Sequence, residues 1–305
     1  MAPFLGKVLV RELELGLQLP SPLQDLHDDR LAGVRLFLKR DDLIHPEVTG
    51  NKWRKLKYLL ADACASRAST LLTFGGAYSN HLRATAAVGR MCGFTTIGVV
   101  RGEEEPHNAM LDAAMSDGMQ LHYMDRATYR RKADPEVIDA LHRRFGDFYL
   151  VPEGGSTEFA VPGCRELVDE IEQPFDVIAC PVGTGGTLAG IAAGLAPGQR
   201  ALGVSVLKGA ASLDDDVRSL QLDATGRVVG NWSIEHRFHC GGFARRSPEL
   251  DEFLGDFDRR HGLRLDHVYV GKLMLAVFAL ISEGAFADGS RVVAVVTGRP
   301  PAGSG

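Results

Sequence analysis

The chain lacks a hydrophobic run long enough to cross a membrane, and its basic residues form no recognisable cluster. With a formal net charge of -5, it offers no electrostatic footprint for a polyanion, so we expect no nucleic-acid partner. Residues 1–16 lack the basic start, long apolar stretch and cleavage site of a signal peptide. We therefore expect a cytoplasmic protein without a membrane partner.

Cysteine is scarce, and no two cysteines have the C-x-x-C spacing of a redox or zinc motif. An odd set of five suits reduced, mostly buried thiols, so we expect no disulfide. The segment "HRFHC", His236 to Cys240, could bring two histidines to one helical face. Because no carboxylate stands beside them, loop or packing roles are favoured, and we predict no metal site.

The composition is that of a soluble globular protein, with 45% hydrophobic and 24% charged residues in 305 positions. Length alone allows one large domain or two smaller ones, and two lobes is our prediction. Short β-branched runs alternate with helical patterns, which is typical of α/β folds built on parallel strands. The predicted strands are "STLLTF", "FTTIGVV", "MQLHYM", "DFYLV", "DVIAC", "ALGVSVL" and "RVVAVV".

The stretch "TGNKWRKLKYLLADA" predicts an amphipathic helix over residues 52–65, with Asn51 available as its N-cap. Lys52 then falls in the first turn, where a cation opposes the helix dipole at a cost of about 0.3–1 kcal/mol. Two interpretations remain at this point. Lys52 is a solvated member of a basic run, or it is kept for its nitrogen.

A glycine-rich turn, Gly183 to Thr187, follows the strand "DVIAC" and opens an alanine-rich helix. Such a turn offers backbone N–H groups and hydroxyls to one anion, and glycine allows a phosphate to approach closely. Leu188 occupies the last glycine position of G-x-G-x-x-G, and the P-loop lysine is absent, so nicotinamide cofactors and ordinary nucleotides are disfavoured. The alternative is an uncharged tight turn.

The segment "TFGGAYSNH" repeats this pattern, with Ser79 and Asn80 at the start of a helix. Ser79 could be an ordinary N-cap. A serine triad is not supported, because the segment lacks G-x-S-x-G and no partner acid is marked.

Six motifs occur in an order that resembles pyridoxal-phosphate (PLP) enzymes of the tryptophan synthase β-like fold. More narrowly, the chain resembles the 1-aminocyclopropane-1-carboxylate deaminase and D-cysteine desulfhydrase family, from about Leu19 to Gly298. The motifs are "KRDDL" (39–43), "GNKWRKL" (50–56), "SNH" (79–81), "GTGGT" (183–187), "VYVGK" (268–272) and "VVTG" (295–298).

By this resemblance, Lys52 would form the Schiff base with the cofactor aldehyde. A desolvated lysine near a helix N-terminus has its ammonium form disfavoured, so its nitrogen is available as nucleophile and base. Ser79 would lie near the substrate carboxylate or the labile carbon, and Tyr269 would face the substrate as a possible acid. Catalytic roles are therefore expected for Lys52, Ser79 and Tyr269.

The resemblance also implies the residues that hold the cofactor. Asn80 would donate to its phenolic oxygen, and Thr297 would meet the pyridine nitrogen without forcing a protonated ring. The phosphate would lie on the glycine-rich turn, formed by Gly183, Thr184, Gly185, Gly186 and Thr187.

Four positions depart from the family patterns. Deaminases of the family resemble "VYEG" and desulfhydrases "VYTG", whereas this chain has Val270 at the third position. Desulfhydrases also resemble "HTGG", whereas this chain has Val296 at the first position and Arg299 at the last. Phe243 replaces a second tyrosine. The cofactor assignment survives these changes, but the substrate does not follow from it.

The resemblance implies a PLP-dependent lyase or deaminase acting on a small amino acid, preferably by β-elimination of D-cysteine. The alternatives are 1-aminocyclopropane-1-carboxylate deamination and a non-catalytic PLP-binding protein of the same fold. Residues 49–152 are expected to form a smaller lobe carrying Lys52 and Ser79, inserted into a larger lobe made of 1–48 and 153–305, with open, mostly parallel twisted sheets flanked by helices. A homodimer is also expected.

Overall fold

The structure, a computed structural model, describes residues 15–48, 50–104 and 108–300. Residues 1–14, which make up most of the segment inspected for a signal peptide, lie outside these ranges. Thr49, the first residue of the expected smaller lobe, lies outside them too.

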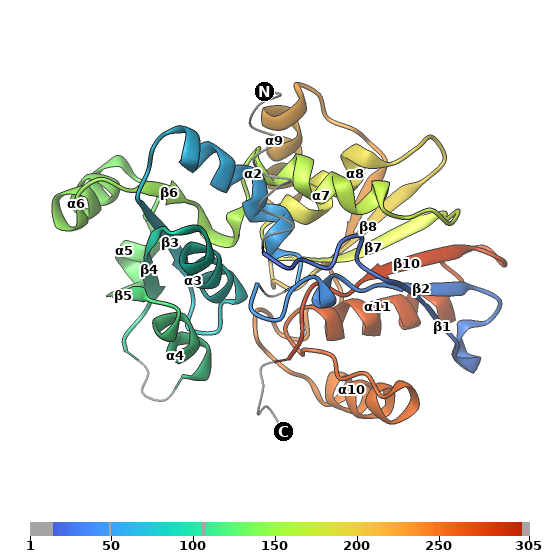
Figure 1. The fold of residues 1–305 in the computed structure, drawn as a ribbon. Coiled ribbons are helices and arrows are strands. Elements are labelled where there is room, and N and C mark those ends of the chain that lie inside the picture. Colours follow the sequence, from blue (N-terminus) through green and yellow to red (C-terminus); the bar gives the residue numbers. More distant parts are fainter. Residues whose placement is uncertain (1–14, 49, 105–107, 301–305) are drawn as a thin grey trace.

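Two separate sheets organise the chain, as Figure 1 shows. The larger sheet has six strands in the order β1-β2-β10-β7-β8-β9, and all its neighbours are parallel except β1 and β2. Its strands come from both ends of the chain: β1 (Leu23–Leu26), β2 (Arg35–Lys39), β7 (Val177–Val182), β8 (Arg200–Ser205), β9 (Trp232–Glu235) and β10 (Arg291–Val295).

The smaller sheet is entirely parallel and has the order β5-β4-β3-β6. Its strands are β3 (Thr70–Gly75), β4 (Thr95–Arg101), β5 (Met119–Met124) and β6 (Tyr149–Val151). The expected α/β fold, with two lobes and mostly parallel sheets, is thus confirmed. The residue bounds of the lobes stay a prediction.

Helices cover both faces of the larger sheet, with α7, α8 and α9 on one side and α10 and α11 on the other (Figure 1). Around the smaller sheet, α2, α3 and α4 pack in clusters separate from that of α5 and α6. The helices are α2 (Lys52–Ala65), α3 (Asn80–Cys92), α4 (Ala109–Ser116), α5 (Arg126–Arg130), α6 (Pro135–Phe145), α7 (Ala160–Asp169), α8 (Gly186–Gly194), α9 (Leu213–Thr225), α10 (Pro248–His261) and α11 (Val270–Ser282).

Strand β10 illustrates why the predicted apolar runs become central strands. Val292 and Ala294 pack in the cluster formed with α11, whereas Val293 and Val295 pack in the cluster formed with α8. A strand covered on both faces needs apolar residues at every position, so its sequence shows a continuous run. All seven predicted strands are present, and the predicted helix over 52–65 coincides with α2.

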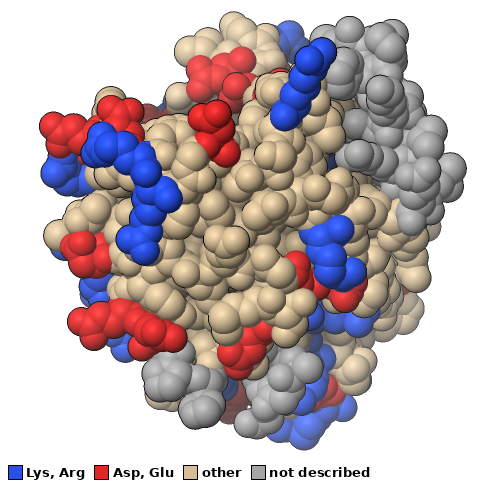
Figure 2. Space-filling model, turned by 60° about the vertical axis from the view of Figure 1, so that its left-hand side comes forward, with Lys and Arg blue, Asp and Glu red and all other residues tan. Residues whose placement is uncertain are grey.

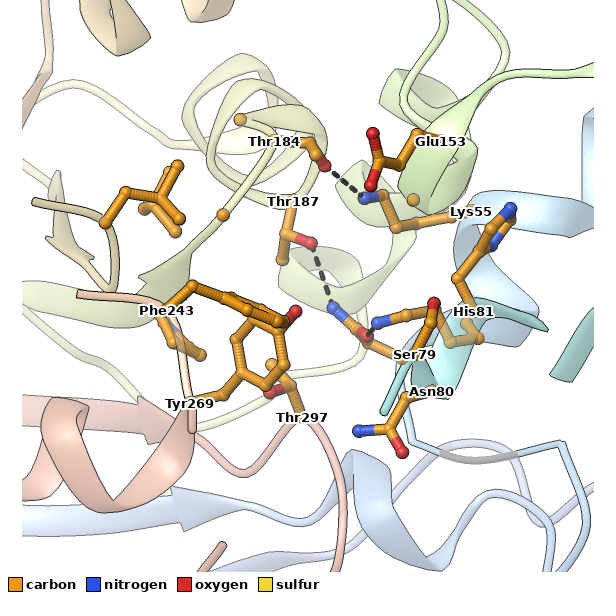
Figure 3. A pocket seen from close by; sticks show the side chains of 18 of the residues that line it. Lys55, Ser79, Asn80, His81, Glu153, Thr184, Thr187, Phe243, Tyr269 and Thr297 are labelled. Carbon is orange, nitrogen blue, oxygen red and sulfur yellow. Dashed lines mark hydrogen bonds between the residues drawn. The ribbon is translucent and has the colours of Figure 1, made fainter. Parts of the chain in front are cut away.

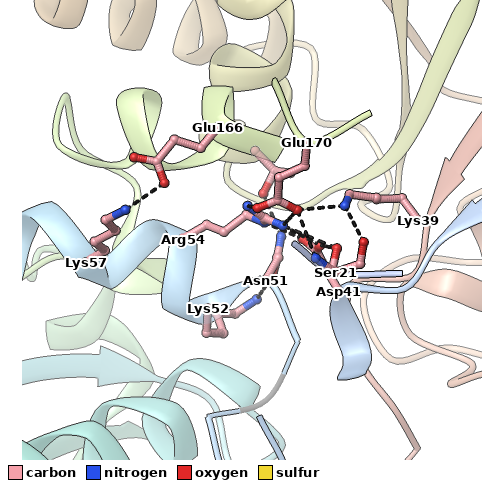
Figure 4. A network of polar contacts seen from close by, with 10 residues as sticks. Ser21, Lys39, Asp41, Asn51, Lys52, Arg54, Lys57, Glu166 and Glu170 are labelled. Carbon is pink, nitrogen blue, oxygen red and sulfur yellow. Dashed lines mark hydrogen bonds and ion pairs between the residues drawn. The ribbon is translucent and has the colours of Figure 1, made fainter. Parts of the chain in front are cut away.

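Helix α2 is fixed to the larger lobe by a buried ionic network, drawn in Figure 4. The guanidinium of Arg54 donates to both carboxylate oxygens of Asp41 at 2.8 and 2.9 Å and to both of Glu170 at 2.8 Å. Lys39, fully buried on β2, donates to Glu170 at 2.6 Å. These bonds fix the start of α2, and with it Lys52, relative to the larger sheet.

Charges of both signs are interspersed on the face shown in Figure 2, and neither sign gathers there. Among the residues described, no helix has the length and apolar character needed to span a bilayer. The segment His236–Cys240 follows β9 outside any helix or strand, and the Nε2 of His236 lies 3.2 Å from a carboxylate oxygen of Asp214.

Candidate active site

A cavity of about 270 Å³ lies where the ends of both sheets and the starts of α2, α3 and α8 meet. Figure 3 shows Ser79, Asn80 and His81 on one wall, opposite Phe243, Tyr269 and Thr297. Among the predicted site residues, all but Gly186 line the cavity: Lys52, Ser79, Asn80, Gly183, Thr184, Gly185, Thr187, Tyr269 and Thr297. Gly186 is buried at the start of α8.

Lys52 is the first residue of α2, and its side chain enters the cavity. Burial lowers the pKa of its amine to about 8, so the uncharged amine is far more populated near neutral pH than in an exposed lysine. Its Nζ donates to Oδ1 of Asn51 at 3.0 Å. Desolvation, as the sequence suggests, makes this nitrogen available.

Asn51 does not cap α2 with its side chain, although it occupies the N-cap position. Its Nδ2 instead donates to Oγ1 of Thr187 at 2.9 Å, while its Oδ1 accepts from Lys52. The side chain therefore links α2 to α8 across the cavity, so the predicted N-cap position is confirmed but the side chain does not form the capping bond.

Gly50 brings the α2 start against the end of β10. Gly50 has a φ of +57°, and a Cβ at this position would lie only 1.7 Å from the Thr297 carbonyl oxygen. The position therefore has no room for a side chain. The backbone N–H of Asn51 donates to that same carbonyl at 3.2 Å. This close approach places buried Thr297 beside the two residues that precede and orient Lys52.

The glycine-rich turn joins β7 to α8 at the cavity wall. Gly185 has a φ of +80°, and a Cβ there would lie 2.9 Å from a methyl group of Val217. Helix α8 begins at Gly186 with its first backbone N–H groups unsatisfied within the helix. The turn thus has the close backbone and helix N-terminus of an anion site.

Lys55 is a site residue that the sequence interpretation missed. It lies three positions after Lys52 on the same face of α2, is buried, and has its pKa lowered to about 7 by burial. Its Nζ donates to Oγ of Ser156 at 2.7 Å. It also donates to Oγ1 of Thr184 at 3.3 Å, as Figure 3 shows. The spacing of the two lysines was a usable signal, but the hydroxyl partners come from distant segments.

Ser79 caps α3, because its Oγ accepts from the backbone N–H of Leu82 at 3.4 Å. The simple N-cap interpretation is therefore correct, and it does not exclude a site role, since Ser79 also lines the cavity. Asn80 follows it on the cavity wall.

His81 has one defined tautomer. The single hydroxyl proton of Thr73 goes to the carbonyl of Val151 at 2.8 Å, so at its 2.8 Å contact with Thr73 the Nε2 of His81 must donate. Burial and the neighbouring lysines hold its pKa well below the usual range, so the ring is neutral. Its Nδ1 is then an acceptor, without a partner among the residues described.

Tyr269 is positioned by the buried carboxylate of Asp266. That carboxylate accepts the backbone N–H groups of Val268, Tyr269 and Val270 at 3.0, 2.6 and 3.1 Å, which satisfies the start of α11. Burial raises the pKa of the Tyr269 phenol, so it stays protonated. The ring of Phe243 meets it edge-on at 6.0 Å.

The positions that depart from the family patterns have different locations. Phe243 lines the cavity, whereas Val270 and Val296 are buried in the core packed around α11. Arg299 donates to the carboxylate of Asp42 at 3.1 Å. Of the described residues at these positions, Phe243 is thus the one that changes the cavity lining directly.

The donor set fits a ligand that carries both a phosphate and an aldehyde. Lys55, Ser156 and Thr184 supply an amine and two hydroxyls beside the glycine-rich turn, which suits a phosphate. One helical turn away, Lys52 supplies an amine of lowered pKa, which suits an aldehyde.

Comparisons with known proteins agree with this chemistry. The chain is 30% identical over 295 residues to a putative 1-aminocyclopropane-1-carboxylate deaminase of Pyrococcus furiosus, covering 91% of this chain and 89% of that protein. A similarly named protein of Thermotoga maritima is 36% identical over 196 residues, covering 60% of this chain and 61% of that one.

Solved structures show the same fold. A crystal structure of an ACC (1-aminocyclopropane-1-carboxylate) deaminase homologue superposes with a TM-score of 0.81 at 28% identity, covering 92% of this chain and 90% of the other. Processed threonine deaminase isoform 2 of Solanum lycopersicum superposes with a TM-score of 0.69 at 18% identity, covering 100% and 86%.

A family model described as pyridoxal-phosphate dependent enzyme matches residues 15–298, which is nearly all of the described chain. The match includes every residue that lines the cavity. The chain therefore belongs to the family of pyridoxal-phosphate dependent enzymes.

Proposed function

We propose that this protein is a PLP-dependent lyase or deaminase that releases ammonia from a small amino acid. The observation that carries the proposal is a readily deprotonated amine, Lys52, in one cavity with the Ser79 hydroxyl and the protonated Tyr269 phenol. These are the groups that proton removal and leaving-group protonation require.

PLP, when bound, supplies an aldehyde for amine exchange and a conjugated ring that stabilises negative charge on the adjacent substrate carbon. Lys52 would hold its aldehyde end and Lys55, Thr184 and the α8 start its phosphate. Asn80 and Thr297 would contact the ring substituents.

The protein's own groups then divide the proton transfers. The Lys52 amine would accept the α-proton, with the Ser79 hydroxyl as a second candidate for this role. Tyr269, whose protonated phenol lines the cavity, would donate the proton to the leaving group. The apolar ring of Phe243 would limit water beside it.

D-cysteine is the preferred substrate in this proposal. One molecule of D-cysteine and one of water would give pyruvate, hydrogen sulfide and ammonia, with the sulfur leaving as the α-proton is removed. A cavity of about 270 Å³ suits a ligand of this size beside the cofactor. Two departures from the family patterns favour this substrate over the cyclopropane. Phe243 stands in the cavity lining where the family pattern has a second tyrosine, and Val270 provides no carboxylate to assist ring opening.

Ring opening of 1-aminocyclopropane-1-carboxylate is the second candidate, and the names of the relatives favour it. It would give 2-oxobutyrate and ammonia without sulfide. The two candidates differ in one product that is simple to measure.

The test is the visible absorption spectrum of the purified protein before and after either amino acid is added, with keto acid, ammonia and sulfide assayed in the same sample. A yellow band that changes while pyruvate, ammonia and sulfide accumulate from D-cysteine supports the proposal. A band that shifts with both amino acids, neither of which is consumed, would instead indicate the non-catalytic PLP-binding alternative.

Homodimer assembly belongs to the same proposal and rests on the family resemblance. Sedimentation equilibrium should then give a mass about twice the 33.0 kDa of one chain. A mass equal to one chain across micromolar concentrations would contradict it.

A further inference from the structure

Arg101 ends β4 at the rim of the cavity, on the side of the smaller sheet. Strands β3 and β4 are parallel, with Gly75 paired to Val100, so their carboxyl ends lie side by side. The chain that leaves β3 forms the turn 76–79, which delivers Ser79 to the cavity. Arg101 is therefore next to the segment that carries a predicted catalytic residue.

The guanidinium of Arg101 lies near two neighbouring groups. Its central carbon lies 5.9 Å from the ring centroid of Tyr129. Tyr129 is itself buried and packs edge-on against Phe74. On the cavity side, Nη2 lies 3.6 Å from the position that a Cβ on Gly76 would take. The side chain, although exposed to solvent, thus lies between the Tyr129 ring and the turn 76–79.

The charge of Arg101 is not matched by a carboxylate within the described part of the chain. The carboxylate that lines the cavity, Glu153, is paired with Lys132 at 3.1 Å. The amine of Lys55 donates to two hydroxyls at the end of the cavity near the glycine-rich turn. Arg101 therefore adds a cation with available N–H donors to a cavity already containing two lysines.

The opposite side of the cavity has a different character. Phe243, Leu207 and Val182 line it with apolar groups. An amino acid whose carboxylate lay against Arg101 and the turn 76–79 would direct a short, uncharged side chain toward this apolar side.

We propose that Arg101 binds the α-carboxylate of the amino-acid ligand through its paired N–H groups and so restricts the site to amino acids with a free carboxylate. The planar guanidinium matches a carboxylate in two parallel hydrogen bonds. This inference rests on the proposed function for the identity of the ligand. It assigns a specificity role to a residue outside the six sequence motifs.

The test uses D-alanine and L-alanine, which have no leaving group, and the corresponding alaninamides, which have no carboxylate. Binding to the holoprotein is followed by the change in cofactor absorbance. In Arg101→Gln, the dissociation constant for the alanine that binds should rise roughly 10–100-fold, the range for a lost charge-assisted pair. The dissociation constant for the corresponding alaninamide should change less than about twofold. Arg101→Lys should fall between wild type and Arg101→Gln.

Arg130→Gln is the matched control, because Arg130 is an exposed arginine on α5 that does not line the cavity. It removes the same charge and should leave both dissociation constants unchanged. An equal loss for alanine and its amide in Arg101→Gln would overturn the inference, because it would indicate a packing role for Arg101. No loss for either probe would overturn it too, as would a wild-type protein that binds neither alanine.

Different results would contradict the proposed function and the proposed role of Arg101. Consumption of D-cysteine with an unchanged KM in Arg101→Gln keeps the proposed function and removes the role of Arg101. Binding of alanine that depends on Arg101, in a protein that consumes neither candidate substrate, keeps the carboxylate site and removes the proposed activity.

Discussion

Lys52 and Lys55 lie on one face of α2, but their amines have different surroundings. Lys55 is the more deeply buried and donates to two hydroxyls beside the glycine-rich turn. Lys52 donates to a side-chain amide of its neighbour and is less enclosed. An amine held between two hydroxyls suits a phosphate, and a less constrained amine suits exchange with a substrate amine, so we expect the two lysines to have separate tasks.

Burial of both amines should make the cofactor-free protein more stable as the pH rises. Their folded pKa values are about 7 and about 8, below the value of 10.5 expected for an exposed lysine. Between the folded and unfolded values the unfolded chain binds more protons, so the free energy of unfolding increases with pH. Each amine contributes up to ~1.4 kcal/mol per pH unit.

Lys55→Met removes one of the two amines and should reduce that increase by about half between pH 8 and 9. Urea unfolding of the cofactor-free variant and wild type at these pH values measures it. A variant with the same slope as wild type would show that Lys55 is ordinarily charged in the folded protein.

At the scale of elements, the connection from β7 to α8 combines a backbone conformation that suits glycine with close packing. Gly185→Ala places a methyl group 2.9 Å from Val217 at a φ of +80°. The turn must shift, and the affinity for PLP should fall at least tenfold, which titration of the cofactor-free protein by absorbance would show.

Gly198→Ala provides the matched control. Gly198 has a φ of +90°, but a Cβ there meets no heavy atom within 4 Å. This variant should lose about 1 kcal/mol of stability from backbone strain and keep its PLP affinity. Equal loss of affinity in both variants would contradict the assignment of the β7–α8 turn to the phosphate.

The elements that could be predicted from the sequence are those covered on both faces, such as β7 and β10, because burial imposes a continuous apolar run. Strands β1 and β9 were not predicted, since they are four-residue edge strands with little burial. Strand β2 ends in Lys39, whose burial depends on Glu170, 131 positions away.

The residues of the candidate site also fall into those that local sequence patterns predict and those that they do not. Local patterns identified the residues next to glycines and helix starts, and the family resemblance supplied roles for them. Lys55, His81 and Arg101 acquire their surroundings from Ser156, Thr73 and Tyr129, which no local pattern connects to them. The side chain of Asn51 was misassigned for the same reason, because its partner Thr187 lies 136 positions away.

At the scale of the whole molecule, the Arg54 network holds the Lys52 helix on the larger lobe. Arg54→Met would leave Asp41 and Glu170 buried with too few partners, and it should cost about 3–5 kcal/mol of unfolding free energy. Urea denaturation of the holoprotein measures the loss.

Arg90→Met is the comparison variant. Arg90 also pairs with two carboxylates, those of Glu47 and Asp117, but its side chain is 45% exposed. Its loss should therefore stay below about 1 kcal/mol. Similar losses in both variants would mean that the buried network does not hold the lobes more firmly than a surface ion pair.

The most direct test of the account is borohydride reduction of the holoprotein followed by peptide mapping. Reduction makes the bond between a lysine amine and the cofactor aldehyde permanent, and we predict the label on Lys52, with no label at Lys55. Lys52→Ala should lose the label, and Lys55→Met should keep it at reduced cofactor affinity. A label on Lys55, or a protein that takes up no PLP, would contradict the assignment of Lys52 on which the proposed function depends.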